Sequence, residues 1–100
     1  MCDTQVIRQH GKIFFAKNSD RESSEPQYIV RVPAVAGDSC TQLNTTYLCI
    51  PQVPDRHGLI LSKPCWIWGA EIGANDQGVV IGNEAVFSRL AGKKNKGLLG

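Results

Sequence analysis

The sequence predicts a fold built mainly from β-strands. Short segments rich in Val, Ile, Phe and Tyr alternate with stretches crowded with Gly, Pro, Asn and Asp, as in strands joined by turns. No convincing amphipathic helix is present before residue 87. Strands without covering helices leave sheet faces and edges exposed. We therefore expect residues 1–100 to be the N-terminal part of a single larger domain.

The first expected element is a β-hairpin. Residues 5–8 and 12–16 are rich in Val, Ile and Phe, and the sequence Gln9-His10-Gly11 separates them. Gly11 supplies the backbone freedom that a tight turn needs, so this spacing predicts two antiparallel strands. His10 is then expected to be an exposed turn residue rather than a catalytic one.

The elements after the hairpin are expected to be short. Polar residues crowd positions 18–27, which predicts a loop, and residues 28–32 form an expected strand that Pro33 ends. Residues 75–78 are typical of a turn. Further strands are expected at three places: residues 45–50, 59–62 and 79–83.

Composition argues against several classes of protein. A hydrophobic share of 42% and a net charge of +2 are typical of a soluble globular domain and argue against disorder. The pI near 8.4 is only mildly basic, and no RNA-binding or helix-turn-helix signature is present, so no nucleic-acid partner is expected. No apolar run approaches the roughly 20 residues that span a bilayer, and polar residues interrupt the N-terminal segment. We expect a cytoplasmic protein without a membrane partner.

The cysteine and histidine pattern argues against a metal site. Reducing surroundings favour free thiols over disulfides. The sequence has no C-x-x-C pair, and neither histidine lies at metal-ligand spacing from a cysteine, so no metal or other cofactor is expected. The four cysteines are Cys2, Cys40, Cys49 and Cys65.

Cys2 follows Met1 directly. Removal of Met1 would leave a thiol and a free α-amine on the same residue. An N-terminal amine titrates near about 8 and a thiol near about 8.5, so the amine can accept the thiol proton directly or through one water. A residue activated by its own amine is an established form of covalent catalysis. A cysteine at the second position also occurs by chance, so the catalytic interpretation of Cys2 depends on the rest of the sequence.

Three segments carry a family resemblance: MCDT at residues 1–4, FAKNSDR at 15–21 and WGAEIGANDQGVVIGNEAV at 68–86. In this order and spacing they closely resemble the secernin and dipeptidase family of N-terminal nucleophile cysteine hydrolases. Penicillin V acylases and bile salt hydrolases are more distant relatives. The resemblance runs over essentially all 100 residues.

The resemblance implies an α+β fold, an αββα sandwich of two stacked antiparallel sheets to which this chain supplies mainly strands. It implies hydrolysis of dipeptides or small amides through an acyl-enzyme, without a cofactor. Two alternatives stay open: an acyltransferase on the same scaffold and a non-catalytic, secernin-like regulatory or binding protein. Family members carry further site residues beyond position 100, so we expect the 100-residue chain to be inactive alone. The oligomeric state stays open.

The resemblance also implies catalytic roles. Cys2 would attack the amide carbon, and Asp20 would orient its α-amine. Asn83 matches an oxyanion-hole donor, a group that is worth roughly 3–4 kcal/mol in a transition state. Asn18 lies two residues before Asp20, so a continuing strand would point both side chains toward the nucleophile. Turn capping is the simpler alternative for this pair.

Charged residues near the motifs are expected to contact substrate. Arg21 and Lys17 are candidates to hold a substrate carboxylate or to stabilise charge near the thiolate. Lys17 stands where acylase relatives carry Arg, and a lysine lacks the planar fork needed for bidentate binding. For Glu71 and Glu84, binding of a substrate amine and the role of an exposed or ion-paired structural carboxylate fit equally well.

Overall fold

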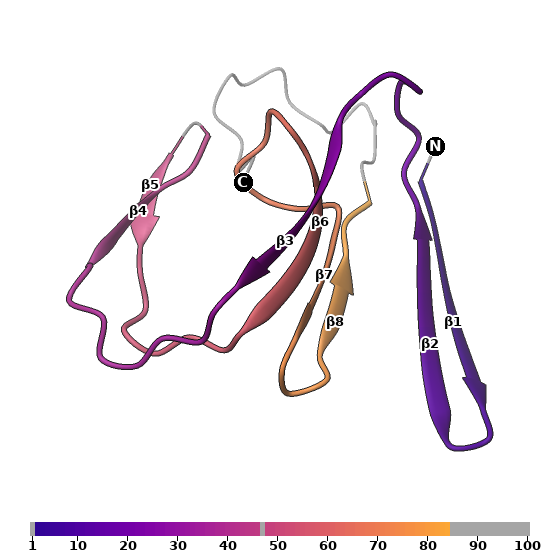
Figure 1. Cartoon of the computed structure of the whole chain (residues 1–100), viewed down its shortest axis with the longest axis horizontal. Coiled ribbons are helices and arrows are strands. Elements are labelled where there is room, and N and C mark those ends of the chain that lie inside the picture. The colour runs from indigo at the N-terminus through magenta and orange to yellow at the C-terminus, as the bar shows by residue number, and fades with distance from the viewer. Residues whose placement is uncertain (1, 47, 85–100) are drawn as a thin grey trace, which may run out of the picture.

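The computed structural model describes residues 2–46 and 48–84, and all regular secondary structure in these residues is β-strand. The strands are β1 (Asp3–Gln9), β2 (Lys12–Asn18), β3 (Gln27–Val32), β4 (Gln42–Asn44), β5 (Cys49–Pro51), β6 (Leu59–Pro64), β7 (Ile72–Asn75) and β8 (Val80–Gly82). All strand pairs are antiparallel. They form a four-stranded sheet in the order β3-β6-β7-β8 and two hairpins, β1-β2 and β4-β5 (Figure 1).

The expectation of an αββα sandwich is wrong for the part of the chain that the structure describes. These residues contain no helix, and their strands divide into three small sheets. The reason lies in the sequence pattern, because a helix needs an apolar repeat of about 3.6 residues. In the second halves of β2 and β3, more exposed and less exposed residues instead alternate with a period of two. Gly, Pro and Asn occur between the strands. None of the described residues forms a helix able to span a lipid bilayer.

The β1-β2 hairpin is confirmed. Gln9 pairs with Lys12, which leaves His10 and Gly11 as the two turn residues. Both have positive φ angles, 50° and 73°, as a type I′ turn requires. The strands extend beyond the predicted segments, so that Asp3 pairs with Asn18 at the open end. The two-residue turn therefore fixes the register of the hairpin, and this register places Asp3 opposite Asn18.

The predicted strand over residues 45–50 is only partly correct, because Cys49 and Ile50 lie in β5 but Thr45 lies outside any strand. Thr45 instead starts the turn between β4 and β5, with its N–H bonded to Leu48 O at 2.7 Å. The Thr45 hydroxyl donates to the same carbonyl oxygen at 2.8 Å and accepts from the Leu48 N–H at 3.0 Å. A threonine side chain that bonds to nearby backbone in this way stabilises a turn at the expense of an extended strand.

The turn before β8 agrees with the prediction for residues 75–78. The Asn75 side-chain oxygen accepts from the N–H groups of Gln77 at 3.0 Å and Val79 at 2.8 Å. Gly78 completes the turn with a φ angle of 81°. Asn75 therefore serves as a turn residue that joins β7 to β8.

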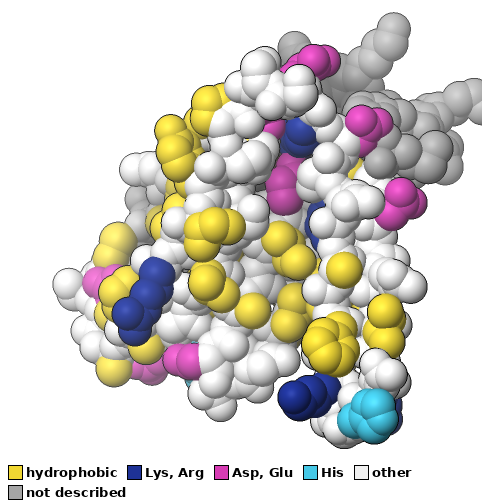
Figure 2. All heavy atoms as spheres, turned by 45° about the vertical axis from the view of Figure 1, so that its right-hand side comes forward, with side chains coloured by type: hydrophobic (Ala, Val, Ile, Leu, Met, Phe, Trp, Pro, Cys, Tyr) yellow, Lys and Arg dark blue, Asp and Glu magenta, His cyan; other side chains and the backbone are white. Residues whose placement is uncertain are grey.

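Little apolar surface is buried in the described residues. Ile67 is the buried hydrophobic residue, and Pro64 has the largest fully buried side chain. Ile29 and Ile81 of the four-stranded sheet are 72% and 69% exposed. Figure 2 shows apolar side chains spread over the surface. The sheet faces are thus exposed, as expected, and burial concentrates between β6 and β7.

Candidate active site around Cys2 and Glu71

Cys2 lies at the open end of the hairpin. It directly precedes β1, whose first residue, Asp3, pairs with Asn18 at the end of β2. Its thiol is half-buried and free. The register brings Cys2 next to the segment that follows β2, which contains Asp20 and Arg21. An ionised Cys2 thiolate would raise the pKa of the Arg21 guanidinium.

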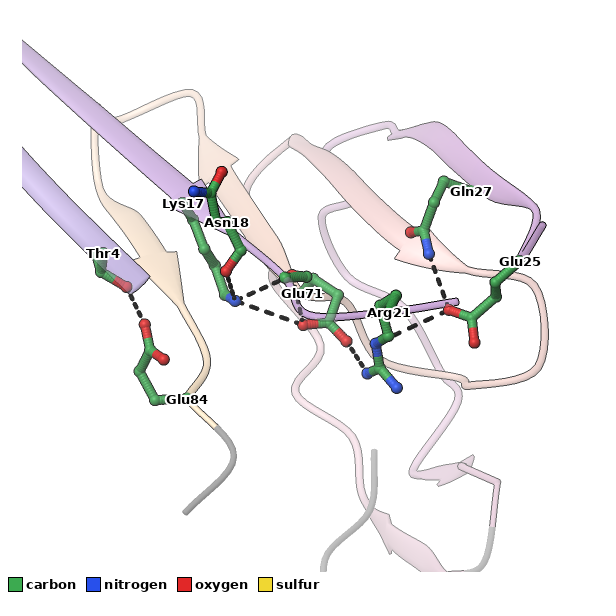
Figure 3. Close-up of polar contacts among 9 residues, drawn as sticks. Thr4, Lys17, Asn18, Arg21, Glu25, Gln27, Glu71 and Glu84 are labelled. Carbon is green, nitrogen blue, oxygen red and sulfur yellow. Dashed lines mark hydrogen bonds and ion pairs between the residues drawn. The ribbon is translucent and has the colours of Figure 1, made fainter. Parts of the chain in front are cut away.

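Glu71 is the buried acidic residue of this region. It lies in the connection between β6 and β7 and is only 5% exposed. Its backbone N–H donates to Ser62 O at 2.9 Å. Its carboxylate accepts hydrogen bonds from Arg21 Nη2 and from Ser19 Oγ, the latter at 3.0 Å (Figure 3). We call Lys17, Ser19, Arg21, Glu71 and Asn83 the Glu71 cluster.

The Glu71 carboxyl group is held in its charged form. Burial by itself raises the pKa of Glu71, because it penalises the charged form. Hydrogen bonds from Arg21 and Ser19, together with the charges of Arg21 and Lys17, outweigh that effect. The pKa of Glu71 therefore lies below its ordinary value, and the carboxylate stays ionised near neutral pH.

Lys17 is the buried cation of the cluster, with a side chain only 1% exposed. Its Nζ lies 3.6 Å from Glu71 Oε2 and donates to Ser19 Oγ at 3.0 Å. It also donates to the Asn18 carbonyl oxygen at 3.2 Å. The ammonium group thus makes two hydrogen bonds and one ion pair, so a substrate carboxylate would have to compete with Glu71 for Lys17.

Arg21 is the more accessible cation, with 32% of its side chain exposed. In addition to Glu71, its Nε lies 3.8 Å from Glu25 Oε1, and its guanidinium stacks 5.4 Å from the Trp66 ring centroid. The hydrogen bond to Glu71 is the main cause that raises the pKa of Arg21, with smaller contributions from the charges of Glu71, Glu25 and Cys2. Arg21 is thus fixed on one side and open on the other.

Asn83 lies at the end of β8 and belongs to the same cluster. Its backbone N–H donates to Glu71 O at 2.9 Å. The Asn83 side-chain amide is oriented so that both its oxygen and its nitrogen have suitable hydrogen-bond partners. In this orientation Nδ2 donates to Glu71 Oε2 at 2.8 Å and to Glu71 O at 3.2 Å. The side-chain amide must therefore rotate away from Glu71 before it can donate to an oxyanion.

The remaining predicted residues lie beside the cluster. Asn18 pairs with Asp3, whereas Lys17 pairs with Thr4, so their side chains lie on opposite faces of the hairpin. In Figure 3 the Asn18 amide points away from Glu71. Asp20 is exposed and lies in the segment between β2 and β3, next to Arg21. Asn18 contacts the cluster through its backbone, because its carbonyl oxygen accepts a hydrogen bond from Lys17 Nζ.

A polar cavity of about 360 Å³ opens beside the cluster. Lys17, Ser19, Arg21 and Glu71 contribute to its wall, and Cys2 does not line it. A larger cavity of about 540 Å³ lies between β2 and the four-stranded sheet, and it is lined mainly by apolar residues. Of these two cavities, the polar one carries the charged groups of the cluster on its wall.

Glu71 and Ser19 are the members of the cluster that the sequence analysis did not place in the site. For Glu71 the structure decides between the two open alternatives in favour of an ion-paired carboxylate. The sequence feature that could have indicated Glu71 is its position as a charged residue among the small and apolar residues of WGAEIGAN. Glu84 accepts a hydrogen bond from the Thr4 hydroxyl, which links β1 to the end of β8.

Within residues 2–46 and 48–84, no group of three or more His, Cys, Asp and Glu side chains is placed to hold a metal ion. No protein-family model matches this chain, and no solved structure matches it.

Proposed function

We propose that this chain carries the nucleophile of a cysteine-dependent amide or peptide hydrolase of the dipeptidase type, related to the secernin-like N-terminal nucleophile hydrolases. The substrate would be a small peptide or amide. The observation that carries the proposal is the convergence of Lys17, Arg21 and Asn83 on Glu71, beside the strand that begins after Cys2. The three motif segments supply these residues from positions far apart in the sequence.

The proposed reaction begins after Met1 is removed. The free α-amine of Cys2 takes the thiol proton, and the thiolate attacks the amide carbon to form a C–S bond. Asp20 orients that amine. The tetrahedral intermediate then breaks its C–N bond, and the leaving amine takes the proton. Water attacks the resulting thioester with the α-amine as base, which releases a carboxylic acid and restores the thiol.

The charged and polar residues of the cluster have distinct tasks in this proposal. Asn83 rotates from Glu71 and donates to the developing oxyanion. Arg21 presents its open side to a substrate carboxylate, a role that suits the planar guanidinium. Lys17 contributes a buried positive charge behind it. We also propose a cytoplasmic location, in which free thiols such as those of Cys2 and the other cysteines persist.

The proposal is tested on the full-length protein by intact-mass spectrometry before and after a brief, low dose of iodoacetamide. The expected result is loss of Met1 and alkylation of Cys2 ahead of Cys40, Cys49 and Cys65. A panel of dipeptides and small amides then follows, with Cys2→Ala as the control that abolishes turnover. Retained Met1, with Cys2 no more reactive than the other cysteines, would contradict the proposal and favour a non-catalytic binding protein.

The same panel distinguishes hydrolysis from acyl transfer. Both reactions share the acyl-enzyme formed on Cys2, and they differ only in whether water or an amine accepts the acyl group. Addition of a second amine to the assay would give a new amide product if transfer dominates. Release of free acid in the presence of that amine supports the hydrolase.

A further inference from the structure

We infer that Glu71 is a positioning residue that fixes the Lys17 and Arg21 side chains and the Asn83 backbone beside the Cys2 end of the hairpin. The inference rests on the proposed function, because it assigns Glu71 a task in the same reaction. Glu71 does not act on the substrate in this assignment. It acts through the Lys17 and Arg21 side chains and through the Asn83 backbone N–H, which donates to Glu71 O.

The topology makes such a residue necessary. The β1-β2 hairpin shares no strand pairing with the other described strands, so side-chain contacts must set its position (Figure 1). Glu71 lies on the β6-β7 connection and contacts Lys17 of β2 and Arg21 of the following segment. It also receives the Asn83 amide from the end of β8. Glu71 therefore joins the nucleophile strand to the strand that carries the proposed oxyanion donor.

The burial of Lys17 depends on the same carboxylate. An ammonium group that is 1% exposed loses almost all of its hydration. Such a group stays buried only when a counter-charge and hydrogen bonds compensate the loss. Glu71 is a negatively charged group that lies within ion-pair distance of Lys17 Nζ. Removal of its charge is expected to drive Lys17 toward solvent.

A neutral isostere cannot reproduce these contacts. The Glu71 carboxylate accepts from Ser19, Arg21 and Asn83 with two oxygens. A glutamine at this position would turn one of those acceptors into a donor, which would face a donor of the cluster. Glu71→Asp keeps both acceptors and the charge on a shorter stem. The charge-preserving variant should therefore retain part of the arrangement that Glu71→Gln loses.

Glu25 provides a matched comparison for the same cation. Its Oε1 lies 3.8 Å from Arg21 Nε, and its other contacts are to Gln27 and Trp66 rather than to Lys17. Glu25→Gln removes one negative charge near Arg21 without touching Lys17. A general effect of charge removal would appear in both variants, whereas a positioning effect on Lys17 belongs to Glu71 alone.

The first experiment does not depend on enzymatic activity. The full-length protein is treated with a lysine-acetylating reagent under native conditions, and the rate of acetylation at Lys17 is followed by mass spectrometry. We expect Lys17 to react roughly tenfold faster or more in Glu71→Gln than in the unmodified protein, because the unpaired ammonium moves to solvent. In Glu25→Gln the Lys17 rate should stay within about twofold of the unmodified protein. An unchanged Lys17 rate in Glu71→Gln would overturn the inference.

The second experiment follows the reaction. With a dipeptide substrate, Glu71→Gln should lower kcat/KM by roughly tenfold or more, as loss of a supporting contact does at other sites. Glu71→Asp should recover part of this loss, and equal losses in both variants would overturn the positioning role. If Glu71→Gln fails to fold, the double variant Lys17→Met, Glu71→Gln removes both buried charges. The folded double variant is compared with Lys17→Met: a further loss of kcat/KM supports the inference, and an equal kcat/KM overturns it.

The two proposals fail in different ways. An unmodified full-length protein without amidase activity overturns the proposed function, while Lys17 acetylation still decides whether Glu71 fixes the cluster. An active protein with an unprotected Lys17 overturns the inference about Glu71 and leaves the proposed function in place.

Discussion

Lys17 and Glu71 form a buried ion pair between β2 and the connection before β7, with 3.6 Å between Nζ and Oε2. The pair joins residues that are far apart in the sequence and lies beside the segment that begins with Cys2. Buried ion pairs are costly to break from one side, because the remaining charge has lost its hydration. The stability and the activity of the protein should both respond to changes in this pair.

Removal of the positive partner tests the ion pair. We expect Lys17→Met to lower the free energy of unfolding by about 1–3 kcal/mol, because Glu71 keeps its bonds from Arg21 and Ser19 but loses one counter-charge. Methionine keeps an apolar stem next to Gly82. Urea unfolding measures the change. Lys12→Met, at the exposed start of β2, is the control and should shift stability by less than about 0.5 kcal/mol.

Acid should weaken the folded state through Glu71. The pKa of Glu71 is lower in the folded protein than its ordinary value of 4.5. The unfolded chain therefore binds its proton first as pH falls. The stabilising contribution is present above pH 4.5 and is lost as pH falls through the lower folded value. The difference in urea midpoint between the unmodified protein and Glu71→Gln should therefore shrink as pH falls from neutral to acidic values. If plots of urea midpoint against pH run parallel for the two proteins, the prediction is contradicted.

Gly82 controls how closely the hairpin approaches β8. A Cβ atom there would lie 3.0 Å from Lys17 Cδ and 3.1 Å from Phe15 Cζ. We expect Gly82→Ala to destabilise the protein by about 1–3 kcal/mol, as overpacking does elsewhere. Thermal unfolding measures the loss. Phe15→Leu should recover part of it in a double-mutant cycle, and strict additivity of the two changes would argue against a direct contact.

The hairpin turn offers a stabilising substitution. His10 has a φ angle of 50°, and asparagine followed by glycine is the preferred pair for a type I′ turn. His10→Asn should raise the free energy of unfolding by a few tenths to about 1 kcal/mol. His10→Val should lower it, because a β-branched residue disfavours positive φ. Equal unfolding midpoints for the two variants would show that the turn is not strained at this position.

Asn83 is expected to act in the transition state. If it donates to the oxyanion, Asn83→Ala should reduce kcat by roughly 100- to 1000-fold with little change in KM. Steady-state kinetics of the full-length protein with a dipeptide separate the two parameters. An effect confined to KM would assign Asn83 to substrate binding instead. Asn75→Ala is the control for loss of an asparagine nearby, since it should affect the turn and stability more than kcat.

The hairpin could be predicted because its information is local. Val, Ile and Phe on both sides of His10 and Gly11 specify two strands and the turn between them. The strand β7 could not be predicted in this way, because Ile72–Asn75 reads Ile-Gly-Ala-Asn and has little strand character of its own. It becomes a strand by pairing with β6 and β8 on its two sides.

The strand predicted to begin at Thr45 was wrong at that end for the opposite reason. Its apolar run has strand character, but the hydrogen bonds of Thr45 to Leu48 favour a turn. The helices of the expected sandwich came only from the family resemblance, and no described segment carries the residue pattern of a helix.

The composition of the candidate site could be predicted better than its geometry. Charged residues near the motifs were expected to contact substrate, and Arg21 keeps an open side that fits this task. The sequence could not show that Glu71 holds Lys17, because the two residues meet only when the β6-β7 connection packs beside β2. Such a long-range ion pair leaves no local pattern.

The stacking of Arg21 on Trp66 gives the site an optical signal. The indole ring lies 5.4 Å from the guanidinium carbon, and its Nε1 donates to Glu25 at 3.1 Å. Indole emission depends on nearby charge, so any ligand that draws Arg21 from the ring should change its intensity or wavelength. The chain has two tryptophans, and Trp68→Phe would leave Trp66 as the single tryptophan of the 100 residues. Ligand binding could then be followed in a titration before any reaction product is known.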